Sequence, residues 1–313
     1  MKTLFRSAWV GALLLAAVPA HAGTYFMIVA GLGGEPDYEQ RFAATATELD
    51  RILKTSGGDI HVYTLIGADA IRPRLEQTLN LIARQARPED GFVLILIGHG
   101  TFDGIEYKFN LVGPDVTANE LAAWCDRVPA RRQLIVNTTS ASGGSIAALD
   151  RPGRAVIAAT KSGTEKNATV FARYWVEALR DPTSDVNKDD ATSALEAFEY
   201  AANKSALFYE SQKRLATEHA VFEDTGKSEP VRAASTETNE GLFLSSFTLL
   251  RFGAAQKAFA DPAKRKLLAR KEELEQKIDR LKYQKAAMTP DDYKQQLTEA
   301  LLDLARIQEE LDQ

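Results

Sequence analysis

The sequence predicts an α/β fold in which a mostly parallel sheet is flanked by helices, followed by an α-helical hairpin at the carboxyl end. Three observations indicate this fold. Apolar runs alternate with amphipathic segments from Thr24 to about Leu250. Runs such as GFVLILIG are short and continuous, which is typical of strands buried on both faces. Around Asp261-Pro262 the composition changes to one rich in Lys, Glu and Leu.

The expected elements follow one another in a regular order. Strands are predicted at residues 24–31, 60–67, 91–98, 132–139 and 154–163. Helices are predicted between them at residues 38–57, 71–86 and 115–128, and Thr117 and Glu120 have the spacing of a capping box at the start of the third. Strands that alternate with helices form parallel sheets, and the ligand site of such a sheet lies beyond the carboxyl ends of its strands.

The last part of the chain, residues 256–313, predicts an antiparallel helical hairpin of coiled-coil type. Apolar residues recur there at three-to-four spacing, and Thr289-Pro290 marks the start of the second helix. The hairpin either packs on the α/β domain of residues 23–255 or presents an apolar stripe to a partner protein. Both alternatives are compatible with the pattern.

The first 22 residues have the pattern of a secretory signal peptide. Lys2 and Arg6 precede an apolar stretch, and Ala20-His21-Ala22 resembles a cleavage site, so the mature chain is expected to start at Gly23. An uncleaved anchor is the alternative. We expect a bacterial protein that is periplasmic or secreted, with no membrane span after cleavage. The single cysteine, Cys125, allows no intramolecular disulfide.

Composition and glycine motifs exclude several function classes. The net charge is −5 without a long basic block, which argues against nucleic-acid binding. GLGGEP follows the first strand, but Pro36 stands where the dinucleotide fingerprint needs its third glycine. SASGG has Ser140 where the nucleophile elbow of α/β-hydrolases has glycine. The remaining candidates are His99-Gly100, after the third strand, and Ser140-Ala141-Ser142-Gly143, after the fourth.

These two motifs resemble those of the legumain and caspase superfamily of peptidases. The likeness is carried by LIGHGTFDGIEYKFNLVGPDVTANELAAWCDRVPARRQLIVNTTSASGGSI, and it extends over residues 24 to 250 through segments similar to bacterial legumain-like proteins. It implies a caspase-like sheet and a cleft for a peptide or protein ligand. It also implies that His99 is the catalytic histidine, that the Gly100 N–H stabilises the oxyanion, and that Ser140 occupies the nucleophile position.

The family's nucleophile is cysteine, and here the position is Ser140. A histidine can hold a thiol as thiolate, whereas a hydroxyl is far less acidic and needs a base in hydrogen-bond contact. We therefore expect a catalytically impaired peptide-binding homologue; the alternative is an active serine-dependent peptidase or amide hydrolase that uses His99 as its base. A third alternative is an interaction protein that acts through the hairpin. Arg41 and Ser142 are the expected substrate-binding residues, and Asp103 could orient His99.

A second constellation, DVNKDDATSALE, has the spacing of a calcium-binding loop. Asp190 replaces the glycine of the sharp turn, so any affinity for Ca²⁺ should be weak, and no cofactor is required. The alternative is a polar turn that caps a helix. The expected ligands are Asp185, Asn187, Asp189, the backbone carbonyl of Ala191, Ser193 and Glu196.

Overall fold

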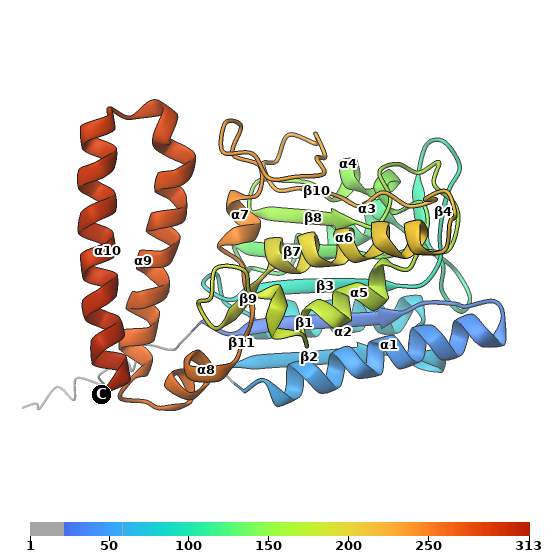
Figure 1. Cartoon of the computed structure of the whole chain (residues 1–313). Helices are drawn as coiled ribbons and strands as arrows, with labels where there is room; N and C mark the ends of the chain where they lie inside the picture. The colour runs from blue at the N-terminus through green and yellow to red at the C-terminus, as the bar shows by residue number, and fades with distance from the viewer. Residues whose placement is uncertain (1–21, 58) are drawn as a thin grey trace, which may run out of the picture.

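The computed structural model describes residues 22–57 and 59–313, so most of the expected signal peptide lies outside the described residues. Its centre is a six-stranded sheet with the strand order β10-β8-β7-β3-β1-β2, in which only β10 is antiparallel to its neighbour. The predicted α/β class is confirmed (Figure 1). The strands are β1 (Thr24–Ala30), β2 (Ile60–Leu65), β3 (Gly91–Ile97), β7 (Arg132–Asn137), β8 (Arg154–Ala158) and β10 (Val221–Glu223).

Two hydrophobic cores cover the two faces of this sheet. In β3, Val93, Ile95 and Ile97 point into one core, and the alternate residues Phe92, Leu94 and Leu96 point into the other. This alternation explains the continuous apolar run, because both faces are covered by helices. The first core is covered by α1 (Pro36–Thr55), α5 (Phe171–Ala178) and α6 (Ala194–Ser211), and the second by α2 (Arg72–Gln85), α3 (Ala118–Cys125) and α4 (Ile146–Leu149).

Local signals in the sequence account for several element boundaries. Thr117 and Glu120 form the predicted capping box at the start of α3, each side chain accepting a hydrogen bond from the other residue's backbone N–H. Ser193 and Glu196 form a second capping box at the start of α6. The fifth expected strand ends at Ala158, five residues earlier than predicted, because Ala159–Gly163 turn across the edge of the sheet.

Two small antiparallel sheets lie outside the central one. The first contains β4 (Gly100–Phe102), β5 (Tyr107–Phe109) and β6 (Val116–Thr117), and it begins directly after His99. The second pairs β9 (Ala191–Ser193) with β11 (Thr248–Arg251), which follows the short helix α7 (Leu242–Ser245). The first of these sheets positions the candidate site, and the second connects the α/β body to the last helices.

The carboxyl end forms the predicted helical hairpin of α9 (Arg265–Gln284) and α10 (Pro290–Asp312), with α9 beside α7 and α10 on the outer side (Figure 1). Helix α8 (Gly253–Ala260) leads into it, so the domain boundary expected at residue 256 falls inside a helix. An ion pair between Arg251 and Glu272 and a hydrogen bond from the Tyr283 hydroxyl to the Glu240 carbonyl attach α9 to the body.

The amino end of the described chain is anchored in the core. The Gly23 backbone N–H donates a hydrogen bond of 2.8 Å to Oδ1 of Asp90, whose side chain is almost fully buried. The other carboxylate oxygen of Asp90 accepts from the Arg87 backbone N–H at 2.7 Å. Across residues 22–57 and 59–313, no helix is long and apolar enough to cross a membrane.

Candidate functional site

His99 and Ser140 lie at the same edge of the central sheet. β3 and β7 are adjacent parallel strands whose registers align Leu96 with Asn137. Both strands therefore end at the same level, and the residues that follow them meet there. His99 comes two residues after β3, and Ser140 comes three residues after β7. This is the edge where the alternating pattern predicted a ligand site.

The Ser140 hydroxyl forms two hydrogen bonds with the Gly100 backbone. Its oxygen accepts a hydrogen bond from the Gly100 N–H at 3.1 Å and its proton is donated to the Gly100 carbonyl, also at 3.1 Å. In the antiparallel pair of β4 and β5, residues whose N–H and C=O groups point toward the partner strand alternate with residues whose groups point away. The Asn110 N–H donates to the His99 carbonyl, so the groups of the next residue, Gly100, point away from β5. Ser140 is 3% exposed and satisfies both of these groups.

Close packing explains why residue 100 is glycine. A Cβ atom at this position would lie 2.6 Å from the Ser140 carbonyl oxygen and 2.5 Å from the Tyr107 ring. Tyr107 is itself fixed, because its hydroxyl is buried and lies 2.6 Å from the hydroxyl oxygen of Thr139. The backbone of β4 can therefore approach Ser140 only without a side chain.

The His99 imidazole lies between two aromatic side chains of α1. Its centroid is 4.8 Å from the Tyr38 ring and 5.1 Å from the Phe42 ring, both in edge-on arrangements. Burial lowers the pKa of His99, and the nearby Arg41 charge lowers it further, while a hydrogen bond with the Gly33 backbone and the charge of Glu35 raise it. The neutral imidazole is therefore favoured near pH 7.

The turn after Ser140 is held by hydroxyl groups. Ala141 has a left-handed backbone with φ 55°, which places Ser142 beneath it. Ser142 is fully buried: its oxygen accepts from the Thr160 N–H at 3.0 Å and lies 3.1 Å from the Thr160 hydroxyl. The hydroxyl of this expected substrate-binding residue therefore faces the next loop and stabilises the turn.

Two acidic residues also shape the site: Glu165, which was assigned no role from the sequence, and Asp103, which was expected to be able to orient His99. The Ala141 N–H donates to the carbonyl of Glu165, whose carboxylate bonds the backbone and ring of His219. His219 lies in the irregular segment just before β10. Asp103 accepts hydrogen bonds from the Ile105 and Glu106 N–H groups, so its carboxylate closes the β4–β5 turn.

A cavity of about 490 Å³ opens between α1 and α5. Neither His99 nor Ser140 lines it, but Phe42, whose ring contacts the His99 imidazole, forms part of its wall. Its floor includes Gly98 and Thr138, the residues that follow β3 and β7. Arg41 lines it and lies over the Tyr38 ring at 4.6 Å. Arg173 contributes a second cation, and among the described residues neither arginine forms an ion pair. The two acidic side chains of the wall are already paired: Glu48 with Arg51 and Arg180, and Glu177 with Lys204.

The loop with calcium-ligand spacing is closed by its own hydrogen bonds. Asp185 is buried, and its carboxylate accepts from the backbone N–H groups of Lys188, Asp189 and Asp190. Glu196 accepts from Val186 and Asn187, and caps α6 with Ser193. Asp190 does adopt the left-handed backbone that a calcium loop requires at this position, with φ 65°.

Several of the expected metal ligands are engaged in contacts of their own. The Asn187 amide donates to the Asp189 carboxylate, and Ala191 is paired with Arg251 in the two-stranded sheet. No group of three or more acidic, histidine or cysteine side chains suited to a metal ion is found in the part of the chain that the structure describes. Calcium binding stays a prediction.

Comparisons with known proteins match solved structures at low similarity. No family model and no curated protein matches the sequence. Among solved structures, the initiator caspase Dronc from Drosophila is 11% identical, with 72% of this chain and 84% of that chain covered and a TM-score of 0.42. Caspase-1 from Spodoptera frugiperda is 14% identical, with 65% and 86% covered and a TM-score of 0.43. Protein GSU0716 from Geobacter sulfurreducens is 12% identical, with 65% and 93% covered and a TM-score of 0.44. At these scores the function has to be argued from the site itself.

Proposed function

We propose that this chain is an exported homologue of the legumain and caspase peptidases that binds peptides in the cleft beside His99 and cleaves them poorly or not at all. The observation that carries the proposal is the pair of hydrogen bonds between Ser140 and Gly100. The motif order, the shared strand edge and the adjacent cavity support the peptidase ancestry.

The hydrogen bonds oppose catalysis at two points. A serine nucleophile transfers its proton to a base, but the Ser140 proton is directed to the Gly100 carbonyl. An oxyanion hole needs a free N–H, but the Gly100 N–H is directed to the Ser140 oxygen. The His99 ring contacts the aromatic rings of Tyr38 and Phe42 and the Gly33 backbone. Attack by Ser140 would require both of its bonds to break.

The cavity supports binding of an acidic peptide side chain. Its size suits a side chain and neighbouring backbone, and it has an apolar wall formed by Phe42, Val176 and Phe208. Arg41 and Arg173 bring two cationic groups without ion-pair partners among the described residues. A carboxylate in the ligand would provide the missing charge, as guanidinium groups bind carboxylates through paired hydrogen bonds.

One observation favours the alternative of a serine-dependent hydrolase. Because the pKa of His99 is lowered, its imidazole is neutral near pH 7 and is able to accept a proton. A change of the Ser140 rotamer toward His99 would then create a nucleophile and base pair. Peptide binding without cleavage and serine-dependent hydrolysis would use the same cleft. They differ in whether the Ser140 rotamer changes when a peptide binds.

The test uses the mature chain from Gly23 and its Ser140→Ala and Ser140→Cys variants. Each is assayed for cleavage of peptides varied before the scissile bond, with and without calcium, and for binding by fluorescence anisotropy. We expect the natural chain to bind without turnover and Ser140→Cys to gain measurable cleavage. Turnover by the natural chain that disappears in Ser140→Ala would establish the hydrolase instead.

A matched pair of variants tests the cavity. Arg41→Gln should weaken binding of an acidic peptide by about tenfold, the value of one charge-assisted hydrogen bond. Arg84→Gln removes the same charge from an exposed position on α2, across the sheet, and should leave the affinity unchanged. Equal affinities for acidic and neutral peptides would contradict the proposed preference.

A further inference from the structure

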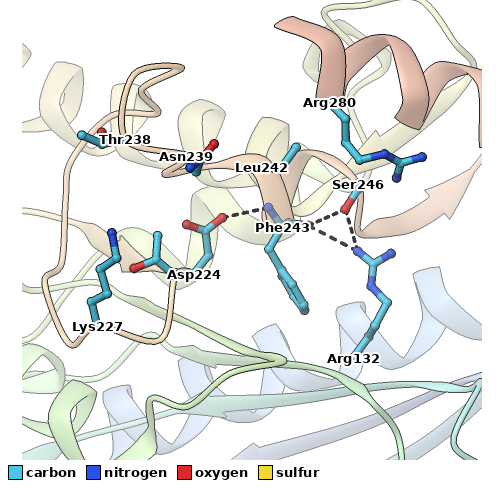
Figure 2. Close-up of a pocket in the computed structure, with 10 residues that line it drawn as sticks. Arg132, Asp224, Lys227, Thr238, Asn239, Leu242, Phe243, Ser246 and Arg280 are labelled. Carbon is cyan, nitrogen blue, oxygen red and sulfur yellow. Dashed lines mark hydrogen bonds between the residues drawn. The ribbon is translucent and has the colours of Figure 1, made fainter. Parts of the chain in front are cut away.

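A second cavity, of about 510 Å³, lies at the opposite end of β7 from Ser140. Arg132 is the first residue of β7, so this cavity is at the amino edge of the sheet. It is bounded by β7, the segment between β10 and α7, α7 itself and α9 (Figure 2). Its polar lining includes Arg132, Lys227, Thr238, Asn239, Ser246 and Arg280.

Arg132 is held in a fixed position at the base of this cavity. Its guanidinium donates to the Ser246 hydroxyl at 2.8 Å and to the Phe243 carbonyl at 3.3 Å. It also lies 4.9 Å from the Phe243 ring centroid and 5.3 Å from that of Phe247. Among residues 22–57 and 59–313 no carboxylate pairs with it, so this largely buried charge has no counter-ion.

Arg280 reaches the same cavity from α9. In Figure 2 the two guanidinium groups lie on either side of the Ser246 hydroxyl. Both arginines line one cavity, and burial and the Arg280 charge both lower the pKa of Arg132. No ion pair of Arg280 is present in the described part of the chain. An anion between the two groups would offset the repulsion between their like charges.

The acidic residue of the cavity does not neutralise these cations. The Asp224 carboxylate accepts backbone hydrogen bonds from Gly241, Phe243 and Leu244, which orient it toward α7 (Figure 2). Lys227 adds a third cation to the wall. Three cationic side chains thus face one carboxylate, and the cavity keeps an excess of two positive charges.

We propose that this cavity binds the phosphate group of a small molecule or of the free ion, with Arg132 and Arg280 as its principal ligands. A phosphate carries a charge of about −1.5 to −2 near pH 7, which matches the excess, whereas a single carboxylate would balance only half of it. Ser246, Thr238 and Asn239 offer further hydrogen bonds. The volume leaves room for an organic part beside the phosphate.

Binding at this position would join two parts of the molecule. Arg132 belongs to the central sheet, and Arg280 belongs to the hairpin. A phosphate that contacts both would hold α9 against the α/β body, in addition to the Arg251–Glu272 ion pair. The proposal is independent of peptide binding, because the two cavities are at opposite ends of β7.

The first measurement is calorimetric titration of the full mature chain with inorganic phosphate, phenyl phosphate and acetate. We expect the better of the two phosphates to bind with a Kd of about 1 mM or below, and acetate to bind at least about tenfold more weakly. Tighter binding of phenyl phosphate would identify an organic ligand, and tighter binding of inorganic phosphate would identify the free ion. Absence of binding by both phosphates would overturn the proposal.

Variants and hydrogen exchange locate the site. Arg280→Gln changes an exposed side chain and should weaken phosphate binding by about tenfold or more. Arg270→Gln removes an exposed arginine from the same helix and should have no effect. Phosphate should slow amide exchange in residues 238–246 and 265–284. Slowing confined to residues 97–100 and 138–142, or equal affinity of Arg280→Gln and the natural chain, would contradict the assignment.

Discussion

The Ser140 hydroxyl and the Gly100 backbone are joined by two hydrogen bonds, each 3.1 Å long. The bonds connect the turn after β7 to the first residue of β4, so one oxygen atom holds together the two segments that carry the peptidase-like motifs. The serine therefore has a structural role that a cysteine would perform less well, because a thiol is a weak donor and acceptor.

Replacement of Ser140 by alanine should destabilise the fold. The variant leaves the N–H and the carbonyl of Gly100 without their partner in a buried environment, which costs about 1–3 kcal/mol of unfolding free energy. Urea unfolding measures the change. Thr101→Ala, at the exposed neighbouring position, serves as the control and should alter stability by less than about 0.5 kcal/mol. Equal stabilities of Ser140→Ala and the natural chain would show that the two bonds contribute nothing net.

Replacement of Gly100 by alanine should disrupt the contact between residues 100 and 140, because the added Cβ would clash with neighbouring atoms. The added methyl group would lie within 2.6 Å of the Ser140 carbonyl and the Tyr107 hydroxyl, which are both fixed by buried neighbours. We expect a loss of about 1–3 kcal/mol, the usual cost of overpacking a core. Tyr107→Phe removes one of the clashing atoms, so Gly100→Ala should cost less in a Tyr107→Phe background than in the natural chain. An unchanged unfolding midpoint in Gly100→Ala would mean that β4 moves freely.

The imidazole of His99 should titrate below the ordinary histidine range. Burial disfavours its charged form, so protonation favours the unfolded chain. The resulting contribution to stability is fully present above the unfolded pKa of about 6.5 and decreases as the pH falls below it. NMR titration of the ring proton in the natural chain and in Arg41→Gln measures this directly. The variant should show a higher pKa, because Arg41 contributes to the lowering; a midpoint at or above 6.5 in the natural chain would contradict the prediction.

The contact between α9 and the loop before α6 should weaken as the pH rises. Burial raises the pKa of Glu275 to about 7 and that of Asp189 to about 6. The Asp189 charge adds to the rise at Glu275, and the charges of Glu196 and Asp185 add to the rise at Asp189. Between pH 4.5 and 7 the folded chain binds more protons than the unfolded chain, so stability decreases with increasing pH across this window. Glu275→Gln should flatten that decrease, whereas Glu273→Gln, exposed on the same helix, should not. Denaturant midpoints at pH 5, 6, 7 and 8 provide the test.

The sequence predicted the sheet, the ends of its first four strands to within two residues, and the hairpin, because these depend on local patterns. The run from Phe92 to Ile97 can be buried only with helices on both faces, and the spacing of Thr117 and Glu120 indicates a helix start independently of any tertiary contact. The antiparallel strand β10 was missed, since Val221–Glu223 is too short to show a period.

The finer geometry of the site depends on contacts between distant residues. The motifs placed His99 and Ser140 at one edge, but the direction of the Ser140 hydroxyl is set by the β4–β5 ladder, which aligns the polar groups of Gly100. Likewise, the spacing of Asp185 and Glu196 suits a metal loop, whereas their carboxylates bond backbone amides that only the folded turn presents. The cationic cavity was not foreseen, because Arg132 and Arg280 are far apart in sequence.

The hydrogen bond between Gly23 and Asp90 would give cleavage of the predicted signal peptide an energetic consequence. In the precursor, the group that faces the carboxylate is an uncharged amide. Cleavage after Ala22, which the sequence predicts, would turn it into the terminal ammonium of the mature protein, so that a hydrogen bond with one charged partner would become an ion pair with two. Cleavage would thereby strengthen the contact between Gly23, just before β1, and Asp90, just before β3. Asp90→Asn would then destabilise the mature form more than the precursor.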